Sequence, residues 1–188
     1  QEFPNGEIMK LSGDTLWWYQ TTLSPGTYSY QYNLEGIKYI ADPWSKDVEW
    51  KDPLTGKESG NFQHALTVFE VGGQEYEWND DSYIRPEMKD LIIYELHVGD
   101  FLGEEDEIGT YENIIEKINS GYFEDLGINT IELMPINEFE GDFSWGYNSS
   151  FSLAPESTYG TPDQLKTLID IAHQYGIAIL FDVVYNHL

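Results

Sequence analysis

The stretch that decides the fold reads Gly176-Ile177-Ala178-Ile179-Leu180-Phe181-Asp182-Val183-Val184-Tyr185-Asn186-His187, in a chain of 188 residues. Its centre, residues 177–181, is a continuous apolar run, which is typical of a strand buried on both faces, as in a parallel sheet covered by helices. Ligands of α/β folds bind beyond the carboxyl ends of the strands. The polar residues after this run, Asp182, Asn186 and His187, could therefore hold a substrate or an ion; the alternative is a strand end with solvated polar residues.

Residues 182–187 resemble the motif at the end of the third strand in the α-amylase family of (β/α)8-barrel glycosidases and transglycosidases, glycoside hydrolase family 13. Upstream blocks extend the resemblance in the family's order: Trp145-Gly146-Tyr147, Ile131-Glu132-Leu133-Met134-Pro135 and Ile93-Tyr94-Glu95-Leu96-His97-Val98. The resemblance is to the branching enzyme, isoamylase and maltooligosyltrehalose trehalohydrolase subgroups. It implies that residues 91–188 form the first three strands and two helices of a TIM barrel, truncated at its end.

The amino-acid composition restricts the classes of binding partner and the kinds of structural bond that the chain can have. The net charge is −25, with 34 acidic and 9 basic residues, which argues against nucleic acid and anionic membranes but is compatible with a neutral polysaccharide. The sequence has no cysteine, so disulfides and thiolate metal sites are excluded. It contains no apolar run long enough to span a membrane and no visible signal peptide, and it leaves cytoplasmic and secreted locations open.

Residues 1–72 have the pattern of an all-β domain. Tyr28, Tyr30 and Tyr32 alternate along a strand and could form either a sugar-stacking platform or the packed face of a sandwich. The turn pattern around Pro25-Gly26 and Asp42-Pro43 resembles the immunoglobulin-like module, of the E-set or CBM48 type, that precedes the barrel in branching enzymes. We expect this module to be truncated at its start and followed by a linker at residues 73–90.

The barrel part begins with a predicted strand at residues 91–96, followed by His97 and Asp100. His97 could be a hydrogen-bonded structural residue or a functional one, and the acidic loop at 103–109 could attract a cation or be solvated. Thr110 is expected to begin a helix that breaks near Gly121, and residues 129–134 are expected to form the second strand.

Residues 135–160 form a loop much longer than usual, which suggests function, and the loop is rich in aromatic residues. Thr161-Pro162-Asp163-Gln164 is a capping box with proline at the first helical position. The helix that follows is expected to pack one apolar face on the sheet, comprising Leu165, Leu168, Ile169, Ala172 and Tyr175.

The resemblance also implies roles for particular residues. Asp182 matches an aspartate that supports the catalytic centre, His187 a substrate-binding histidine, and Asn186 a position that binds calcium in many α-amylases. Tyr147 resembles the aromatic platform under the same sugar, and Trp145 is a further substrate-binding candidate. We expect Tyr147, Asp182 and His187 to converge on one cleft.

No carboxylate of this chain matches a catalytic one, because the family places those after later strands. Glu95 and Glu132 fall inside neighbouring strands and could do acid–base work, but the resemblance favours structural roles for them, because the family's catalytic carboxylates lie on later strands. No cofactor is expected to be required, although calcium is possible.

The sequence therefore predicts a fragment of a retaining enzyme that acts on α-glucans, most like the 1,4-α-glucan branching enzyme and inactive and poorly stable on its own. A trehalohydrolase or debranching enzyme of the same family, or a non-catalytic glucan-binding protein, are alternatives. An unrelated doubly wound α/β domain would instead require an open sheet.

Overall fold

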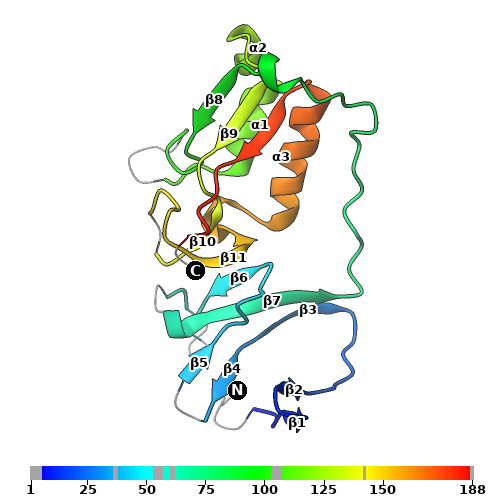
Figure 1. Ribbon diagram of the computed structural model, residues 1–188, viewed down its shortest axis with the longest axis vertical. Coiled ribbons are helices and arrows are strands. Elements are labelled where there is room, and N and C mark those ends of the chain that lie inside the picture. The colour runs from blue at the N-terminus through cyan, green and yellow to red at the C-terminus, as the bar shows by residue number, and fades with distance from the viewer. Residues whose placement is uncertain are drawn as a thin grey trace. The chain divides into compact units, whose positions relative to one another are not determined.

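A computed structural model describes residues 6–35, 38–52, 57–59, 62–102, 107–141 and 143–186 (Figure 1). The chain divides into two compact units. The first comprises residues 1–42 and 48–74, and the second comprises residues 43–47 and 75–188. Each unit is described by itself below.

The first unit is built from short antiparallel strands. Its central sheet has the order β3-β7-β6, with β3 at Gly26–Tyr30, β7 at Ala65–Val71 and β6 at Val48–Trp50. Two further strand pairs and one 3-10 helix complete it: β1 (Lys10–Ser12) with β2 (Leu16–Trp18), β4 (Tyr32–Leu34) with β5 (Lys38–Ile40), and η1 (Phe62–His64). The immunoglobulin-like character of this unit stays a prediction.

The tyrosine row of the first unit is engaged in packing and hydrogen bonds. Tyr30 and Tyr32 both donate their hydroxyl hydrogens to Oδ2 of Asp42, over 2.8 and 2.9 Å. The ring of Tyr28 stacks on Phe69 at 5.8 Å between centroids. Burial, followed by the bond to Asp42, raises the pKa of Tyr30 well above its ordinary value. These contacts favour a packed face over a free sugar-stacking platform.

The second unit contains three parallel strands in the sheet order β12-β9-β8. They are β8 at Ile93–Leu96, β9 at Thr130–Leu133 and β12 at Ala178–Phe181. The remaining elements are η2 (Met88–Asp90), α1 (Tyr111–Asn119), α2 (Tyr122–Asp125), β10 (Asn137–Phe139), β11 (Ser149–Pro155), η3 (Ser157–Tyr159) and α3 (Pro162–Gln174). Neighbouring strands thus follow the chain order, as predicted for the start of a barrel. No helix in the described part of the chain has the length and apolar character needed to cross a membrane.

Local sequence signals account for the helix boundaries. Thr110 caps α1 and Thr161 caps α3, each accepting a hydrogen bond from the backbone N–H three residues later in a reciprocal capping box. Gly121 adopts a left-handed conformation with φ of 81° between α1 and α2. Glycine tolerates this conformation because it has no Cβ, so the predicted break near Gly121 is confirmed.

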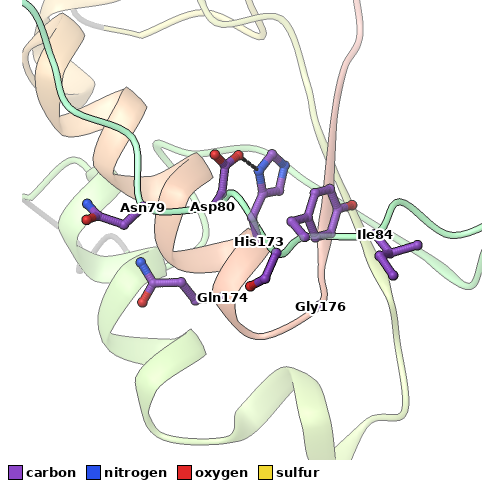
Figure 2. Close-up of a pocket in the computed structure, with 8 residues that line it drawn as sticks. Asn79, Asp80, Ile84, His173, Gln174 and Gly176 are labelled. Carbon is purple, nitrogen blue, oxygen red and sulfur yellow. Dashed lines mark hydrogen bonds and ion pairs between the residues drawn. The ribbon is translucent and has the colours of Figure 1, made fainter.

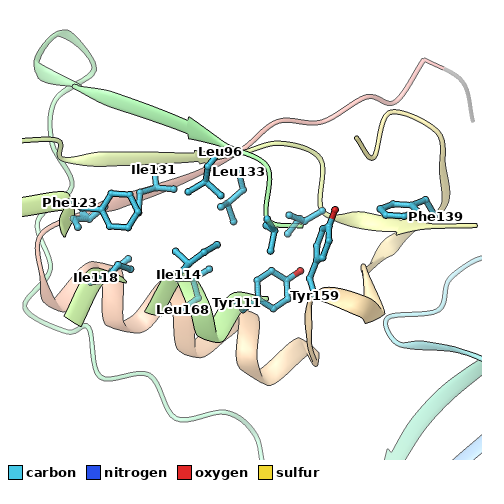
Figure 3. Close-up of a cluster of buried hydrophobic side chains, with 14 residues drawn as sticks. Leu96, Tyr111, Ile114, Ile118, Phe123, Ile131, Leu133, Phe139, Tyr159 and Leu168 are labelled. Atoms are coloured by element: carbon cyan, nitrogen blue, oxygen red, sulfur yellow. The ribbon is translucent and has the colours of Figure 1, made fainter. Parts of the chain in front are cut away.

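The core of the second unit lies between the sheet and the helices α1 and α3 (Figure 3). Leu96, Ile131 and Leu133 from the strands are buried with Ile114 and Leu168 from the helices. Alternation along a strand places the intervening residues on the opposite face of the sheet.

Two expectations about burial were wrong. Phe181 is 45% exposed, so β12 is not buried on both faces in the described structure, where α1 and α3 cover one face only. Tyr175 is 48% exposed, because it lies at the C-cap of α3, where the helical periodicity ends; Ile171 packs against the core in its place.

Part of the expected linker is instead packed on α3. The backbone N–H of Asn79 donates to Oδ1 of buried Asp170 over 2.9 Å, and the Asn79 amide donates to Oδ2 over 3.0 Å. Burial raises the pKa of Asp170, but these bonds together with that from Tyr76 outweigh burial and hold it below its ordinary value. Residues 75–84 therefore belong structurally to the second unit.

Candidate functional site

Tyr147 and Asp182 meet at the carboxyl end of the parallel sheet. Asp182 directly follows β12, and its backbone N–H donates to the carbonyl of Leu133 over 2.9 Å. The hydroxyl of Tyr147, which comes from the long loop after β9, donates to Oδ2 of Asp182 over 2.6 Å. This bond, the largest cause, raises the pKa of Tyr147 to about 12, so the hydroxyl stays protonated. Tyr147 as a whole remains 38% exposed, so its ring can present a face to a ligand.

Two further carboxylates act on Tyr147 through their charge. Glu95 and Glu132 are register partners on the neighbouring strands β8 and β9. They alternate with the buried residues Leu96 and Leu133, so they point to the face of the sheet away from α1 and α3. Both raise the pKa of Tyr147 through their negative charge, although each does so less than the hydrogen bond to Asp182.

His97 follows β8 and is held by hydrogen-bonding partners on both ring nitrogens. Its side chain is only 6% exposed. Nε2 lies 2.9 Å from the carbonyl oxygen of Ser144 and 2.9 Å from the hydroxyl of Tyr159. Nδ1 accepts from the backbone N–H of Asp100 over 3.2 Å and lies 3.1 Å from that residue's carboxylate. This geometry favours the reading of His97 as a hydrogen-bonded structural residue over that of a ligand contact.

Comparison with known proteins agrees with this arrangement. Residues 100–188 match the family model described as "Alpha amylase, catalytic domain". This part of the chain belongs to the alpha-amylase family. The strands β9 and β12 and the loop bearing Tyr147 lie within the matched residues, whereas β8 at Ile93–Leu96 precedes them.

Several members of the alpha-amylase family resemble the chain over most of its length. The malto-oligosyltrehalose trehalohydrolase of Saccharolobus solfataricus is 41% identical over 63% of this chain and 20% of the relative. That of Deinococcus radiodurans is 38% identical over 96% of this chain and 27% of the relative. The 1,4-alpha-glucan branching enzyme of Cutibacterium acnes is 32% identical over 98% of this chain and 30% of the relative.

A solved structure shares the fold. A protein named as an alpha amylase, from Salmonella typhimurium, superposes with a TM-score of 0.76 at 31% identity, covering 96% of this chain and 28% of that one. The chain therefore spans less than a third of the length of each of these relatives. The fold is that of α-amylase barrel proteins over their corresponding segment.

The structure brings together some of the predicted site residues. Tyr147 and Asp182 are in direct contact, whereas His187 lies outside the described residues. Trp145 is 61% exposed two residues before Tyr147, and Asn186 is exposed near the end of the described chain. Calcium at Asn186 stays a prediction; in the described ranges no three His, Cys, Asp or Glu side chains are grouped so that they could hold a metal. Residues 103–106 of the acidic loop also lie outside the described residues.

Sequence reasoning missed two buried glutamates in the long loop. The loop folds into the β10–β11 hairpin; Glu138 lies in β10, Glu156 directly follows β11, and both are fully buried. Glu138 accepts from the backbone N–H of Ser157 over 2.7 Å, and Glu156 accepts from those of Phe139 and Thr158 over 3.1 and 3.0 Å. Burial raises the pKa of Glu156 despite these bonds and a further one with Glu138. The hydrogen bonds of these two glutamates thus connect the β10–β11 hairpin to η3.

One signal could have identified Glu156. It immediately precedes Ser157-Thr158-Tyr159, where an acidic side chain can cap a helical turn. For Glu138 the sequence carries no comparable local signal, because its partner lies nineteen residues away.

A small cavity of about 210 Å³ lies at the opposite end of β12 (Figure 2). Nδ1 of His173 lies 2.7 Å from Oδ2 of Asp80, and the ring of Tyr83 stacks on the imidazole at 3.9 Å between centroids. Gly176, just before β12, lines the cavity, whereas Asp182 follows the strand. The cavity therefore lies at the amino end of the sheet, away from the end where α/β folds bind ligands.

Proposed function

We propose that the Tyr147–Asp182 end of the sheet forms a subsite for an α-glucan, and that the complete protein carrying this chain is a retaining glycosidase or transglycosidase. The observation that carries the proposal is the bond between the Tyr147 hydroxyl and Asp182. It fixes an aromatic ring by its polar end while the ring face stays accessible. An aromatic face can cover the apolar face of a sugar ring, and nearby carboxylates can accept hydrogen bonds from its hydroxyl groups.

For the activity of the complete protein, we propose malto-oligosyltrehalose trehalohydrolase as the first candidate and 1,4-α-glucan branching as the second. The sequence alone favoured the branching enzyme. The order is reversed because relatives named as trehalohydrolases are 41% and 38% identical, against 32% for the branching enzyme. The complete gene product incubated with malto-oligosyltrehalose should release trehalose. Formation of α-1,6 branches from linear amylose, without trehalose release, would favour the second candidate.

The subsite is tested by measuring how malto-oligosaccharides bind to the protein. Binding is monitored by NMR of tyrosine rings labelled with ¹³C. We expect Tyr147→Ala to weaken binding about five- to tenfold, because loss of a modest contact of about 1 kcal/mol changes affinity on that scale. Tyr175→Ala is the matched control, since Tyr175 is similarly exposed but lies at the other end of β12. Equal affinities of the two variants would overturn the assignment of the subsite.

A further inference from the structure

We propose that His97 is a positioning residue that holds the loop segment 144–147 and thereby sets the place of the Tyr147 ring relative to Asp182. His97 touches neither residue directly; it acts through the backbone of Ser144, three residues before Tyr147. The consequence for glucan binding rests on the function proposed above, whereas the positioning itself does not.

The protonation of the ring decides how His97 holds this segment. The carbonyl oxygen of Ser144 can only accept, so the contact of 2.9 Å requires a hydrogen on Nε2. The backbone N–H of Asp100 can only donate, and in the neutral ring it bonds the free lone pair of Nδ1 over 3.2 Å. Both contacts are satisfied together by the Nε2–H tautomer. The carboxylate of Asp100, 3.1 Å from Nδ1, can instead accept a hydrogen from that nitrogen when both ring nitrogens are protonated. In both forms Nε2 keeps the hydrogen that it donates to Ser144.

The ring cannot easily turn away from this arrangement. His97 is buried, and the rings of Phe143 and Tyr159 meet it edge to face, at 6.2 and 5.9 Å between centroids. Tyr159 is itself buried beside Tyr111 in the core of the unit (Figure 3). Through Tyr159, the donor to Ser144 is thus anchored to the core of the unit.

The chain between Ser144 and Tyr147 transmits this constraint. Oγ of Ser144 accepts from the backbone N–H of Gly146 over 3.0 Å and also contacts the side chain of Asn148. Gly146 has φ of 81° and packs against Pro135, leaving no room for a Cβ. Few torsions remain free between the carbonyl that His97 holds and the Cα of Tyr147. Displacement of Ser144 should therefore move the Tyr147 hydroxyl away from Asp182.

The test reads the Tyr147–Asp182 bond directly. Because that bond raises the pKa of Tyr147 to about 12, a titration of the ¹³Cζ resonance of Tyr147 reports whether the hydroxyl still reaches the carboxylate. Glutamine and asparagine supply a matched pair of substitutions. The amide of His97→Gln reaches the place of Nε2 and can still donate to Ser144, whereas that of His97→Asn reaches only the place of Nδ1.

We expect His97→Asn to increase the acid dissociation constant of Tyr147 by up to about a hundredfold, toward an ordinary pKa of about 10, and His97→Gln to restore most of the wild-type value. Tyr159→Phe should leave the constant unchanged, since it removes a neighbour of Nε2 but not the bond to Ser144. The proposal would be overturned if the folded His97→Asn variant kept the wild-type pKa of Tyr147. It would also be overturned if the Asn and Gln variants changed that pKa equally. If malto-oligosaccharide binds without involving Tyr147, the proposed function fails while this titration still tests the positioning.

Discussion

Gly146→Ala should destabilise the protein and displace Tyr147. Gly146 has φ of 81°, a region that costs a residue with a Cβ roughly 1–2 kcal/mol. A Cβ there would also overlap the carbonyl oxygen of Pro135 and lie 2.9 Å from its Cβ and 3.0 Å from its carbonyl carbon. Carbon atoms pack at about 3.5–4.0 Å, so the backbones must separate by roughly 0.5–1 Å.

The magnitude follows from these two effects. Overpacking against atoms that cannot rotate away costs roughly 1–3 kcal/mol, so the total loss should be about 2–5 kcal/mol in the free energy of unfolding. Gly141→Ala is the control in the same loop. Gly141 has φ of 91°, but a Cβ there would meet nothing within 4 Å. That variant should lose only the roughly 1–2 kcal/mol of backbone strain.

The assay is urea unfolding followed by tryptophan fluorescence, combined with the titration of Tyr147. Since Ser144, Gly146 and Tyr147 form one short segment, relief of the clash should weaken the bond to Asp182 and lower the pKa of Tyr147 in Gly146→Ala only. If both alanine variants lose the same stability and titrate like the wild type, the close approach of Gly146 to Pro135 does not govern this loop.

Three further outcomes are expected. Asp182→Asn should lower the pKa of Tyr147 from about 12 toward its ordinary value, measured by tyrosinate absorbance; an unchanged titration would mean that the bond is not formed in solution. Burial raises the folded-state pKa of Glu156, so its contribution to stability is complete below pH about 4.5 and is lost as the pH rises through the folded value. In Glu156→Gln the free energy of unfolding, measured with urea at several pH values, should fall less over this range. A fall as steep as in the wild type would refute this expectation. Asp170 has a folded-state pKa below its ordinary value, so its stabilisation is present above pH about 3.8 and is lost as the pH falls through the folded value. Asp170→Asn should lower the free energy of unfolding by about 1–3 kcal/mol at neutral pH, whereas Asp163→Asn, on the exposed side of α3, should lower it much less. Equal losses in the two variants would argue against the packing of residues 75–84 on this helix.

The parts of the fold that the sequence predicted depend on local signals. The capping residues Thr110 and Thr161 and the break at Gly121 each act within one or two helical turns, so they can be recognised without knowing what packs nearby. The failure at Tyr175 has the same origin. The helical periodicity of the sequence places Tyr175 on the apolar face of α3. Tyr175 is the C-cap residue, however, and its side chain is exposed.

The burial of Asp170 and Glu138 could not be predicted, because it depends on segments distant in sequence. Asp170 was not among the residues predicted to pack on the sheet, and in the structure it is buried where Asn79 and the residues around it pack against α3. Glu138 is covered when β10 pairs with β11, at a hairpin register interrupted by irregularities. Such non-local pairing carries little signal in a single sequence.

For the candidate site, family resemblance and topology supplied what residue patterns could not. Tyr147 and Asp182 are 35 residues apart, and only the expectation that neighbouring parallel strands share a carboxyl end predicts that they meet. His97 was left open because a histidine after a strand is compatible with either role. Its partners Ser144 and Tyr159 come from the long loop, whose conformation the sequence did not reveal.

The electrostatics of this end of the sheet restrict the ligand further. Asp182 accepts the hydrogen of the Tyr147 hydroxyl, and Glu95 and Glu132 also act on that hydroxyl through their negative charges, in a chain whose net charge is −25. A phosphate or a polyanion entering there would meet repulsion from all three, whereas the hydroxyl groups of a neutral sugar can donate to them. Tyr147 donates its own hydrogen to Asp182, so its polar edge is occupied and its ring face is what remains for a ligand. An aromatic face beside several hydrogen-bond acceptors matches a ring with one apolar face and many hydroxyl groups. The charge pattern and the geometry of the tyrosine therefore favour the same class of ligand on independent grounds.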